Sequence, residues 1–198
     1  MHKNKNFSTI LAMAIAIVLC SAFAGTTALA SPVTRDIPDG AFLMVDLNAN
    51  TYWAYGSYRA LPEGMPKPYI DEYGNTLIPL RFLEVMSVVD TIEWDDSIMS
   101  ISFMNYDEFF FMIIGSPHYE IDDGISLGLY TFKDAANNNV SPRLIDSRTY
   151  LPLRAVMEQM LGFRVDFLNG AIYVFESYDP DAARVPATDR ERDAYFGF

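Results

Sequence analysis

The sequence is poor in the residues that most often build metal and redox sites. Its 198 residues include one cysteine and two histidines. Copper and zinc sites usually need several converging histidine or thiolate ligands. Because Cys20 and His2 fall in an N-terminal leader, His118 is the only such ligand left for the folded part. A histidine- or thiolate-based metal site is therefore excluded, and we expect no cofactor.

Basic side chains are also scarce, with 14 lysines and arginines against 26 aspartates and glutamates and a formal net charge of −12. An acidic chain without a basic run repels phosphate backbones, so nucleic acid is not an expected partner. No G-x-S-x-G motif is present, and any histidine base would have to be His118. Carboxylates are too abundant for one sugar-cleaving pair to stand out. We therefore predict that the protein is not an enzyme.

The one long apolar run lies at the N-terminus. It extends from Phe7 to Ala24, follows Lys3 and Lys5, and precedes Ala-Leu-Ala at 28–30. A basic start, an apolar run and small residues at a cleavage site are the parts of a secretory signal peptide. We therefore predict a signal peptide at 1–30. The protein would be secreted or cell-wall associated, and it would meet the membrane only through this peptide before cleavage.

Two alternatives to a cleaved signal peptide remain open. An uncleaved anchor is disfavoured because the run is barely long enough to span a bilayer. A lipoprotein would be modified at Cys20, where the preceding Ile17-Val18-Leu19 lacks the usual small residue. Cleavage before Ser31 would leave a chain without cysteine, so stability would have to come from a hydrophobic core, which a chain of this length can form.

A repeat dominates the remaining sequence. The segment TLIPLR at 76–81 recurs as TYLPLR at 149–154. After the second copy, apolar residues follow the i, i+3, i+4, i+7, i+8 spacing of an amphipathic helix. Pro152 suits the first helical position and Gly162 suits a left-handed stop, so the pattern predicts a helix over about 152–161.

Strand patterns flank both copies of the repeat. Asn169-Gly170 between alternating apolar residues predicts a β-hairpin. Similar alternation predicts a hairpin after the first copy, with a turn at 95–97, and two strands within 41–55. Residues 107–129 are expected to form a strand, a Gly-Ser-Pro turn and a second hairpin around 122–124.

These patterns predict an α+β fold of two tandem repeats, about 41–104 and 107–176, packed as one globular unit. Each repeat would contain antiparallel β-strands, one short helix and a β-hairpin. Residues 31–40 are expected to be an N-terminal linker. Residues 177–198 have no period and are expected to be a flexible C-terminal tail.

The repeated pattern resembles the copper amine oxidase N-terminal-like domain, also called the stalk domain, of secreted Gram-positive bacterial proteins. The resemblance covers roughly 42–176. The matching residues are Thr76, Pro79, Leu80, Arg81, Ile92 and Trp94 in the first copy, and Thr149, Pro152, Leu153, Arg154, Glu158, Gly162 and Val165 in the second. The departures are Glu84 out of register, Val89 in place of glycine and Phe167 in place of tryptophan. The resemblance implies a small antiparallel sheet folded around a helix, and it does not imply copper or amine oxidation.

Two groups of polar and aromatic residues are candidate sites. Arg81 and Arg154 are expected to be structural, each pairing with a carboxylate or with carbonyls, although they could instead grip an anionic ligand. The aromatic residues Tyr52, Trp53, Tyr55 and Tyr58 could stack on sugar rings. Alternatively, they are core and strand-surface residues. The acidic pairs at 95–96 and 122–123 lack the spacing of a calcium loop and are expected to form turns.

The sequence therefore favours a secreted, non-enzymatic envelope or extracellular protein with a structural, attachment or protein-interaction role. The alternative is a cell-wall glycan-binding module that uses the aromatic residues at 52–58. The partner would be an unknown cell-envelope protein or a glycan.

Overall fold

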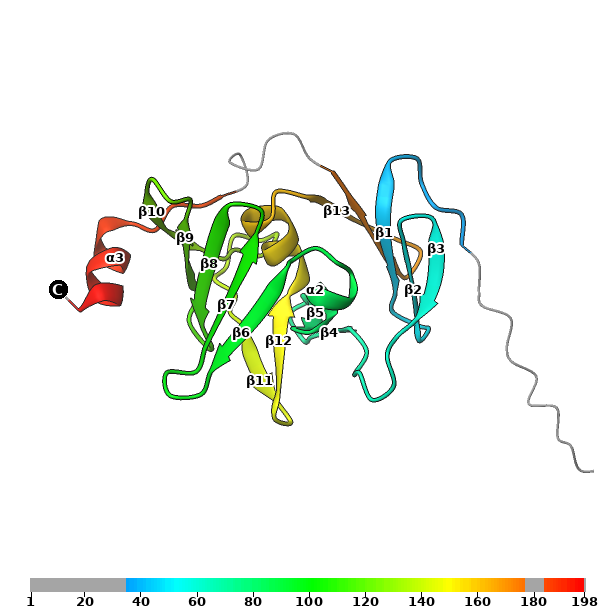
Figure 1. Cartoon of the computed structure of the whole chain (residues 1–198), viewed down its shortest axis with the longest axis horizontal. Coiled ribbons are helices and arrows are strands. Elements are labelled where there is room, and N and C mark those ends of the chain that lie inside the picture. The colour runs from blue at the N-terminus through cyan, green and yellow to red at the C-terminus, as the bar shows by residue number, and fades with distance from the viewer. Residues whose placement is uncertain (1–34, 177–183, 198) are drawn as a thin grey trace, which may run out of the picture. The chain divides into compact units, whose positions relative to one another are not determined.

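The computed structural model describes residues 35–176 and 184–197, which are mostly antiparallel β-strands with a few short helices (Figure 1). This content is compatible with the predicted α+β class. The predicted signal peptide at 1–30 lies outside the described residues. Within the described ranges, no helix is long and apolar enough to cross a membrane.

The strands form three antiparallel sheets, here named A, B and C. Sheet A has the order β13 (Arg164–Leu168), β14 (Ala171–Phe175), β1 (Ala41–Asp46), β2 (Thr51–Ala54) and β3 (Ser57–Ala60). Sheet B has the order β11 (Arg143–Ile145), β12 (Arg148–Pro152), β5 (Thr76–Pro79) and β4 (Tyr69–Ile70). Sheet C has the order β10 (Leu127–Thr131), β9 (His118–Asp122), β8 (Glu108–Ile113), β7 (Ser100–Asn105) and β6 (Thr91–Asp95). The helices are α2 (Phe82–Val85), the π-helix η1 (Ala155–Met160) and α3 (Asp189–Phe196).

The two copies of the repeated segment pair with each other at the centre of sheet B. Ile78 of β5 lies opposite Leu151 of β12, and both side chains are fully buried. The Leu80 N–H donates to the Thr149 carbonyl at 2.9 Å, which makes these two residues a hydrogen-bonded pair. Because hydrogen-bonded and non-hydrogen-bonded pairs alternate in an antiparallel ladder, Pro79 falls at a non-hydrogen-bonded pair. Its missing N–H therefore breaks no bond to β12.

Pro152 is the last residue of β12, so the prediction that it begins a helix is wrong. It lies opposite Leu77, which is the matching non-hydrogen-bonded position of the same ladder. A proline costs nothing there, just as it would at the start of a helix, and the sequence alone does not distinguish the two positions.

Sheet A joins strands from distant parts of the chain, whereas the strands of sheet C are consecutive. In sheet A the hairpin β13–β14 pairs with β1, so Val45 lies opposite Ile172. In sheet C the hairpin β6–β7 pairs with β8, so Phe103 lies opposite Phe110. Along the chain, the order of three strands, two sheet B strands, a helix and a hairpin occurs twice.

The hairpin predicted at Asn169-Gly170 is confirmed. Leu168 pairs with Ala171, and the two turn residues have φ values of 53° and 78°. Both values lie in the left-handed region that a two-residue turn of this kind requires, and glycine reaches it without strain.

The predicted helix is present, but it is shorter than expected and is a π-helix. The Leu161 N–H donates to the Val156 carbonyl, five residues back, at 3.0 Å. Gly162 follows with φ 71°, as predicted for the stop. The apolar residues of the predicted stripe are all buried, namely Leu153, Val156, Met157, Met160 and Leu161.

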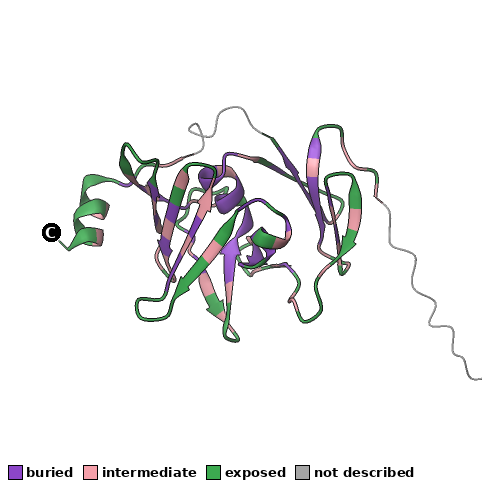
Figure 2. Cartoon of the chain, viewed as in Figure 1, coloured by how far each residue is buried: buried purple, intermediate pink, exposed green. Residues whose placement is uncertain are grey.

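One hydrophobic core joins the three sheets and the two helices α2 and η1. Ile172 of sheet A, Leu151 of sheet B, Phe103 of sheet C, Phe82 of α2 and Val156 of η1 belong to the same buried cluster. Figure 2 shows buried residues concentrated on β1, β12 and η1. Short helices are marginal alone, so burial in this core is what stabilises α2 and η1.

Two buried tyrosines attach the helices to the sheets. The Tyr119 hydroxyl of β9 donates to the Gln159 carbonyl of η1 at 2.8 Å. The Tyr52 hydroxyl of β2 donates to the Val85 carbonyl of α2 at 3.4 Å. Burial raises the pKa of Tyr119, so its hydroxyl stays protonated and remains a donor.

The C-terminal segment differs from the predicted flexible tail. Residues 185–187 run along the edge of sheet C, where the Thr131 N–H donates to the Val185 carbonyl at 2.8 Å and the Ala187 N–H donates to the Leu129 carbonyl at 2.9 Å. Arg184 forms a salt bridge with Glu108 at 2.9 Å. This segment covers part of an edge strand that would otherwise present unpaired backbone groups.

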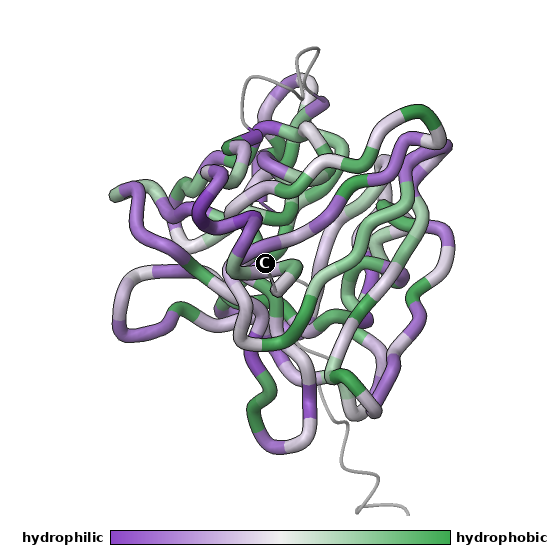
Figure 3. The backbone as a smooth tube through the Cα atoms, turned by 90° about the vertical axis from the view of Figure 1, so that its left-hand side faces the viewer, coloured by the Kyte–Doolittle hydropathy of each residue, from purple (hydrophilic) through white to green (hydrophobic). Residues whose placement is uncertain are grey.

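Helix α3 follows this segment and is exposed and mainly hydrophilic (Figures 2 and 3). It starts with a capping box, in which the Thr188 hydroxyl accepts from the Glu191 N–H at 3.3 Å and the Glu191 carboxylate accepts from the Thr188 N–H at 2.8 Å. The T-x-x-E motif at 188–191 is typical of a helix N-terminus, so the start of this helix could have been predicted from the sequence.

The predicted N-terminal linker at 31–40 is instead attached to sheet A from Arg35 onward. The Arg35 guanidinium forms a salt bridge with Asp46 at 2.6 Å and donates to the Asn169 carbonyl at 2.7 Å. The Asp46 side chain is 3% exposed. The hydrogen bond from Arg35 holds the pKa of Asp46 below its usual value.

We expect Leu151→Ala to destabilise the protein by about 2–5 kcal/mol, because it opens a cavity at the centre of the fully buried β5–β12 pair. The control is Leu144→Ala on the edge strand β11, where the leucine is exposed. It should cost less than about 1 kcal/mol. Urea unfolding measures both values. Equal losses in the two variants would contradict the central role of this pair.

We expect Asp46→Asn to lower the free energy of unfolding by about 1.5–3 kcal/mol at pH 7, because Arg35 loses a charged acceptor. A carboxyl group with a lowered folded pKa stabilises the fold above its unfolded value of 3.8 and loses that effect as the pH falls through the folded pKa. The difference between variant and parent should therefore shrink in acid. Unfolding curves recorded from pH 7 downward test this, with Asp39→Asn as the exposed control. A difference that does not vary with pH would contradict it.

Candidate functional site

Two clefts lie beside the β5–β12 pair, one next to each copy of Pro-Leu-Arg. The Arg154 cleft has a volume of about 250 Å³ and is lined by residues that include Ile70, Asn75, Lys133, Leu153, Arg154 and Phe167. The Arg81 cleft has a volume of about 730 Å³ and is lined by residues that include Met65, Arg81, Trp94, Met99, Leu144 and Arg148. The Arg154 cleft lies between the end of β12, the turn before β5 and the hairpin β13–β14. The Arg81 cleft lies between the end of β5, the turn before β12 and the hairpin β6–β7.

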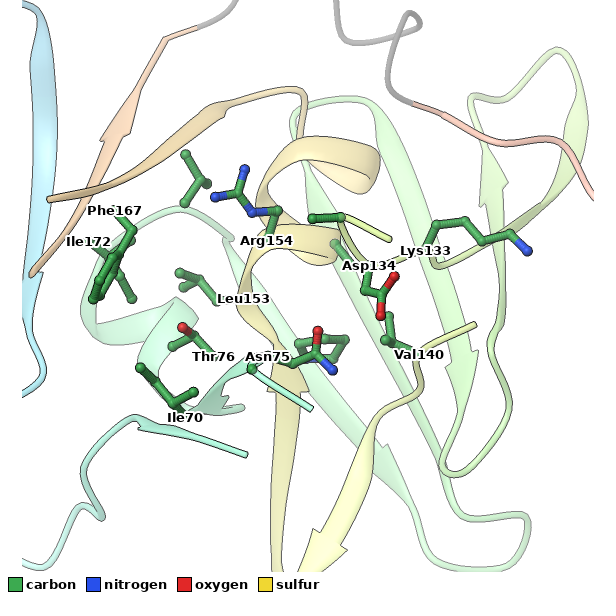
Figure 4. Close-up of a pocket in the computed structure, with 15 residues that line it drawn as sticks. Ile70, Asn75, Thr76, Lys133, Asp134, Val140, Leu153, Arg154, Phe167 and Ile172 are labelled. Atoms are coloured by element: carbon green, nitrogen blue, oxygen red, sulfur yellow. The ribbon is translucent and has the colours of Figure 1, made fainter. Parts of the chain in front are cut away.

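The Arg154 cleft has little free charge. Figure 4 shows Phe167 and Ile172 on one side and Lys133 and Asp134 on the other, with Arg154 between them. Lys133 donates to the Asn139 side chain. Asp134 accepts from the backbone N–H of Asn138, and this bond lowers the pKa of Asp134.

Arg154 has a structural partner, as expected. Its guanidinium lies 3.0 Å from the Glu158 carboxylate, which also accepts from the Val165 N–H at 3.1 Å. Glu158 therefore links η1 to both Arg154 and β13. Burial raises the pKa of Glu158, and the charge of Arg154 opposes that shift.

Arg81 differs from Arg154. In the described part of the chain, Arg81 has no ion-pair or hydrogen-bond partner for its guanidinium, and neither does Arg148, which lines the same cleft. Glu84 follows Arg81 by three residues, whereas Glu158 follows Arg154 by four, and Glu84 makes no such pair. The expectation of a structural partner is therefore met by Arg154 and not by Arg81.

Trp94 is the aromatic residue of the Arg81 cleft and is 37% exposed. Trp94 lies near the end of β6, and its indole N–H donates to the Asp96 carboxylate in the turn between β6 and β7. Met99 and Leu144, both exposed, add apolar surface from the same hairpin and from β11.

Sequence reasoning identified Arg81 and Trp94 but missed Met65, Leu144 and Arg148. These three residues come from the β3–β4 loop, β11 and the start of β12. Only the fold brings them together. The sequence held one indication of Arg148. It comes directly before Thr149 of the second copy, whereas the matching position of the first copy is Asn75.

The four aromatic residues at 52–58 occupy different environments. Tyr52 is 4% exposed, packs on Phe82 and belongs to the main core, so it is not available to a surface ligand. Trp53 and Tyr58 are partly buried against a smaller cluster on sheet A. The Tyr58 hydroxyl also donates to the Arg35 carbonyl at 2.9 Å. Tyr55 alone is largely exposed, at 56%, and its ring stacks on Phe42.

The remaining polar candidates form ordinary local contacts. The His118 ring nitrogen Nδ1 lies 3.1 Å from the Thr131 hydroxyl oxygen. Asp95 and Asp123 accept hydrogen bonds from backbone N–H groups two residues further on, which is turn chemistry. Among the described residues, no group of three or more histidines, cysteines and acids is placed to hold a metal ion.

The fold is thus a set of antiparallel sheets around one core, with clefts that combine arginine and aromatic residues. Comparison with protein families matches residues 62–174 to the copper amine oxidase N-terminal domain. The match spans more than half of the chain, so the chain belongs to this family. The domain is a non-catalytic part of copper amine oxidase. Comparisons with curated proteins and with solved structures give no significant match.

We expect the two arginines to differ in their effect on stability. Arg154→Ala should cost up to about 1 kcal/mol, because its pair with Glu158 is partly exposed. Arg81→Ala should stay within about 0.5 kcal/mol of the parent. The Arg154→Ala loss should fade in acid, because it requires the ionised form of Glu158. Thermal and urea unfolding measure these effects.

Glu158→Ala serves as the positive control in the same series. It removes the acceptor of the Val165 N–H and should cost about 1–3 kcal/mol. Equal losses for Arg81→Ala and Arg154→Ala would contradict the distinction between the two clefts.

Proposed function

We propose that this protein is a secreted, non-enzymatic protein of the cell envelope or extracellular space, with a structural, attachment or protein-interaction role. The observation that carries this proposal is membership in a family whose defining domain is non-catalytic. The chemistry of the Arg81 cleft agrees, because guanidinium, indole and thioether groups line it beside two carboxylates, Glu63 and Asp96. Guanidinium, indole and thioether groups recognise ligands by charge pairing and by packing.

The molecule is best understood as two copies of one unit that exchange hairpins. In support, the same order of elements occurs twice, and β5 and β12 pair with Ile78 opposite Leu151, the two residues that occupy the same place in the repeated segment. The hairpin of each unit pairs with the three strands of the other unit to form a five-stranded sheet. Such an arrangement leaves neither unit with a complete sheet of its own, which suits a rigid attachment module.

The alternative is a cell-wall glycan-binding module. The specific observation in its favour is the exposed ring of Tyr55, stacked on Phe42 on sheet A. An exposed ring of this kind offers an apolar face on which a sugar could stack. The partner classes are therefore an envelope protein or a glycan, and they can be separated experimentally.

Expression of the full chain in a Gram-positive host tests the proposal. We expect the protein in the medium or the wall fraction, with an intact mass that places Ser31 at its N-terminus. We also expect no co-sedimentation with purified peptidoglycan. Retention in the cytoplasm would contradict the proposed location.

Peptidoglycan binding that Tyr55→Ala abolishes would favour the glycan alternative. The matched control is Tyr106→Ala, since Tyr106 is an exposed tyrosine in the turn between β7 and β8. Binding lost equally in both variants would indicate non-specific adsorption, which also contradicts the glycan alternative.

A further inference from the structure

The Arg81 cleft contains charged groups of both signs, two arginines and the carboxylates of Glu63 and Asp96. Arg81 and Arg148 both line it, and neither guanidinium has a partner among the described residues. The whole chain carries a formal charge of −12. Arginine presents a planar fork of donors that matches a carboxylate in a bidentate way. Among the described residues, neither Glu63 nor Asp96 pairs with these arginines, so both forks are open to a carboxylate of a ligand.

The same cleft offers apolar surface next to these charges. Met65, Trp94, Met99 and Leu144 line it, and its volume of about 730 Å³ lies in the usual range for ligand sites. Methionine side chains adapt to irregular apolar partners, and tryptophan is a frequent anchor at interfaces. The ligand should therefore combine a carboxylate with neighbouring apolar groups.

The corresponding positions of the Arg154 cleft show how the two sites differ. There the arginine is neutralised by Glu158, Asn75 stands in the place of Arg148, and Phe167 stands in the place of Trp94. The volume is about 250 Å³, roughly a third of that of the other cleft. Compared with the Arg154 cleft, the Arg81 cleft lacks a carboxylate that pairs with the repeated arginine, contains a second arginine and has a larger volume.

We propose that the Arg81 cleft binds an extended peptide segment of a partner protein, in which an aspartate or glutamate adjoins apolar side chains. This inference rests on the proposed interaction role and specifies the partner class. A polyanionic polymer is disfavoured because the net negative charge of the chain would repel it. A neutral sugar chain would offer the two guanidinium groups hydroxyl acceptors but no anionic partner. A peptide with a single carboxylate and apolar neighbours satisfies both halves of the cleft.

The test starts with a phage-displayed library of random dodecapeptides, selected on the secreted full-length protein. The Arg81→Ala/Arg148→Ala double variant serves for counter-selection. The selected peptides are then synthesised, each with a partner in which the acid is replaced by its amide. Affinities are measured by calorimetry and by the fluorescence of Trp94 in a Trp53→Phe background.

We expect the selected peptides to carry an acid beside apolar residues. Their affinity should fall at least about tenfold with Arg81→Ala, and by a similar factor with the amide peptide, because a charge-assisted pair is lost. Trp94→Phe, which copies the residue of the other cleft, should weaken binding to a lesser degree. The matched control Arg154→Ala should leave affinity unchanged, because that arginine already pairs with Glu158.

Three results would overturn the inference. The first is a selection that enriches no peptide over the double variant. The second is peptide binding that Arg81→Ala does not weaken. The third is a Trp94 signal that saturates with soluble peptidoglycan fragments in an Arg81-dependent manner, which would make the occupant a glycan. If one of these results is obtained while the protein still reaches the medium or the wall fraction, the proposed function stands and only this site is wrong.

Discussion

The antiparallel pairing of β5 with β12 is the interaction on which the rest of the structure depends. It places Ile78 against Leu151 at the centre of the core and carries the chain directly into α2 and η1. The recurrence of Pro-Leu follows from this pairing. Each proline must sit at a non-hydrogen-bonded position, and each leucine must fill the core where its strand ends.

The two arginines show how one sequence pattern can serve two purposes. Arg154 has a carboxylate four residues later and links η1 to β13 through Glu158. Arg81 follows the same proline and leucine, but its nearest helix acid is one residue out of register. A partly exposed ion pair contributes little to the free energy of folding, so the absence of such a pair at Arg81 lowers stability only slightly. The released guanidinium becomes available to a ligand, which is how a structural motif can acquire a binding role.

Several local elements were predictable because their signals are local. The Asn169-Gly170 turn requires two left-handed residues, and the apolar stripe after Leu153 marks the buried face of η1. The capping box of α3 was also present in the sequence, although Arg184–Ala187, which hold the helix to sheet C, gave no comparable signal. Period and turn chemistry therefore recover strands, turns and helix ends, but they do not say which edge a segment will join.

The sequence by itself determined the family, the strand and hairpin segments and the buried apolar faces, because these follow from repeated motifs and from the spacing of neighbouring residues. Only the tertiary structure decided that β13–β14 pairs with β1, that Tyr52 turns into the core, and that Arg148 joins Arg81 in one cleft. Each of these depends on contacts between segments far apart in the chain. Such contacts are set by the fit of whole sheets around a shared core, and no local pattern encodes them.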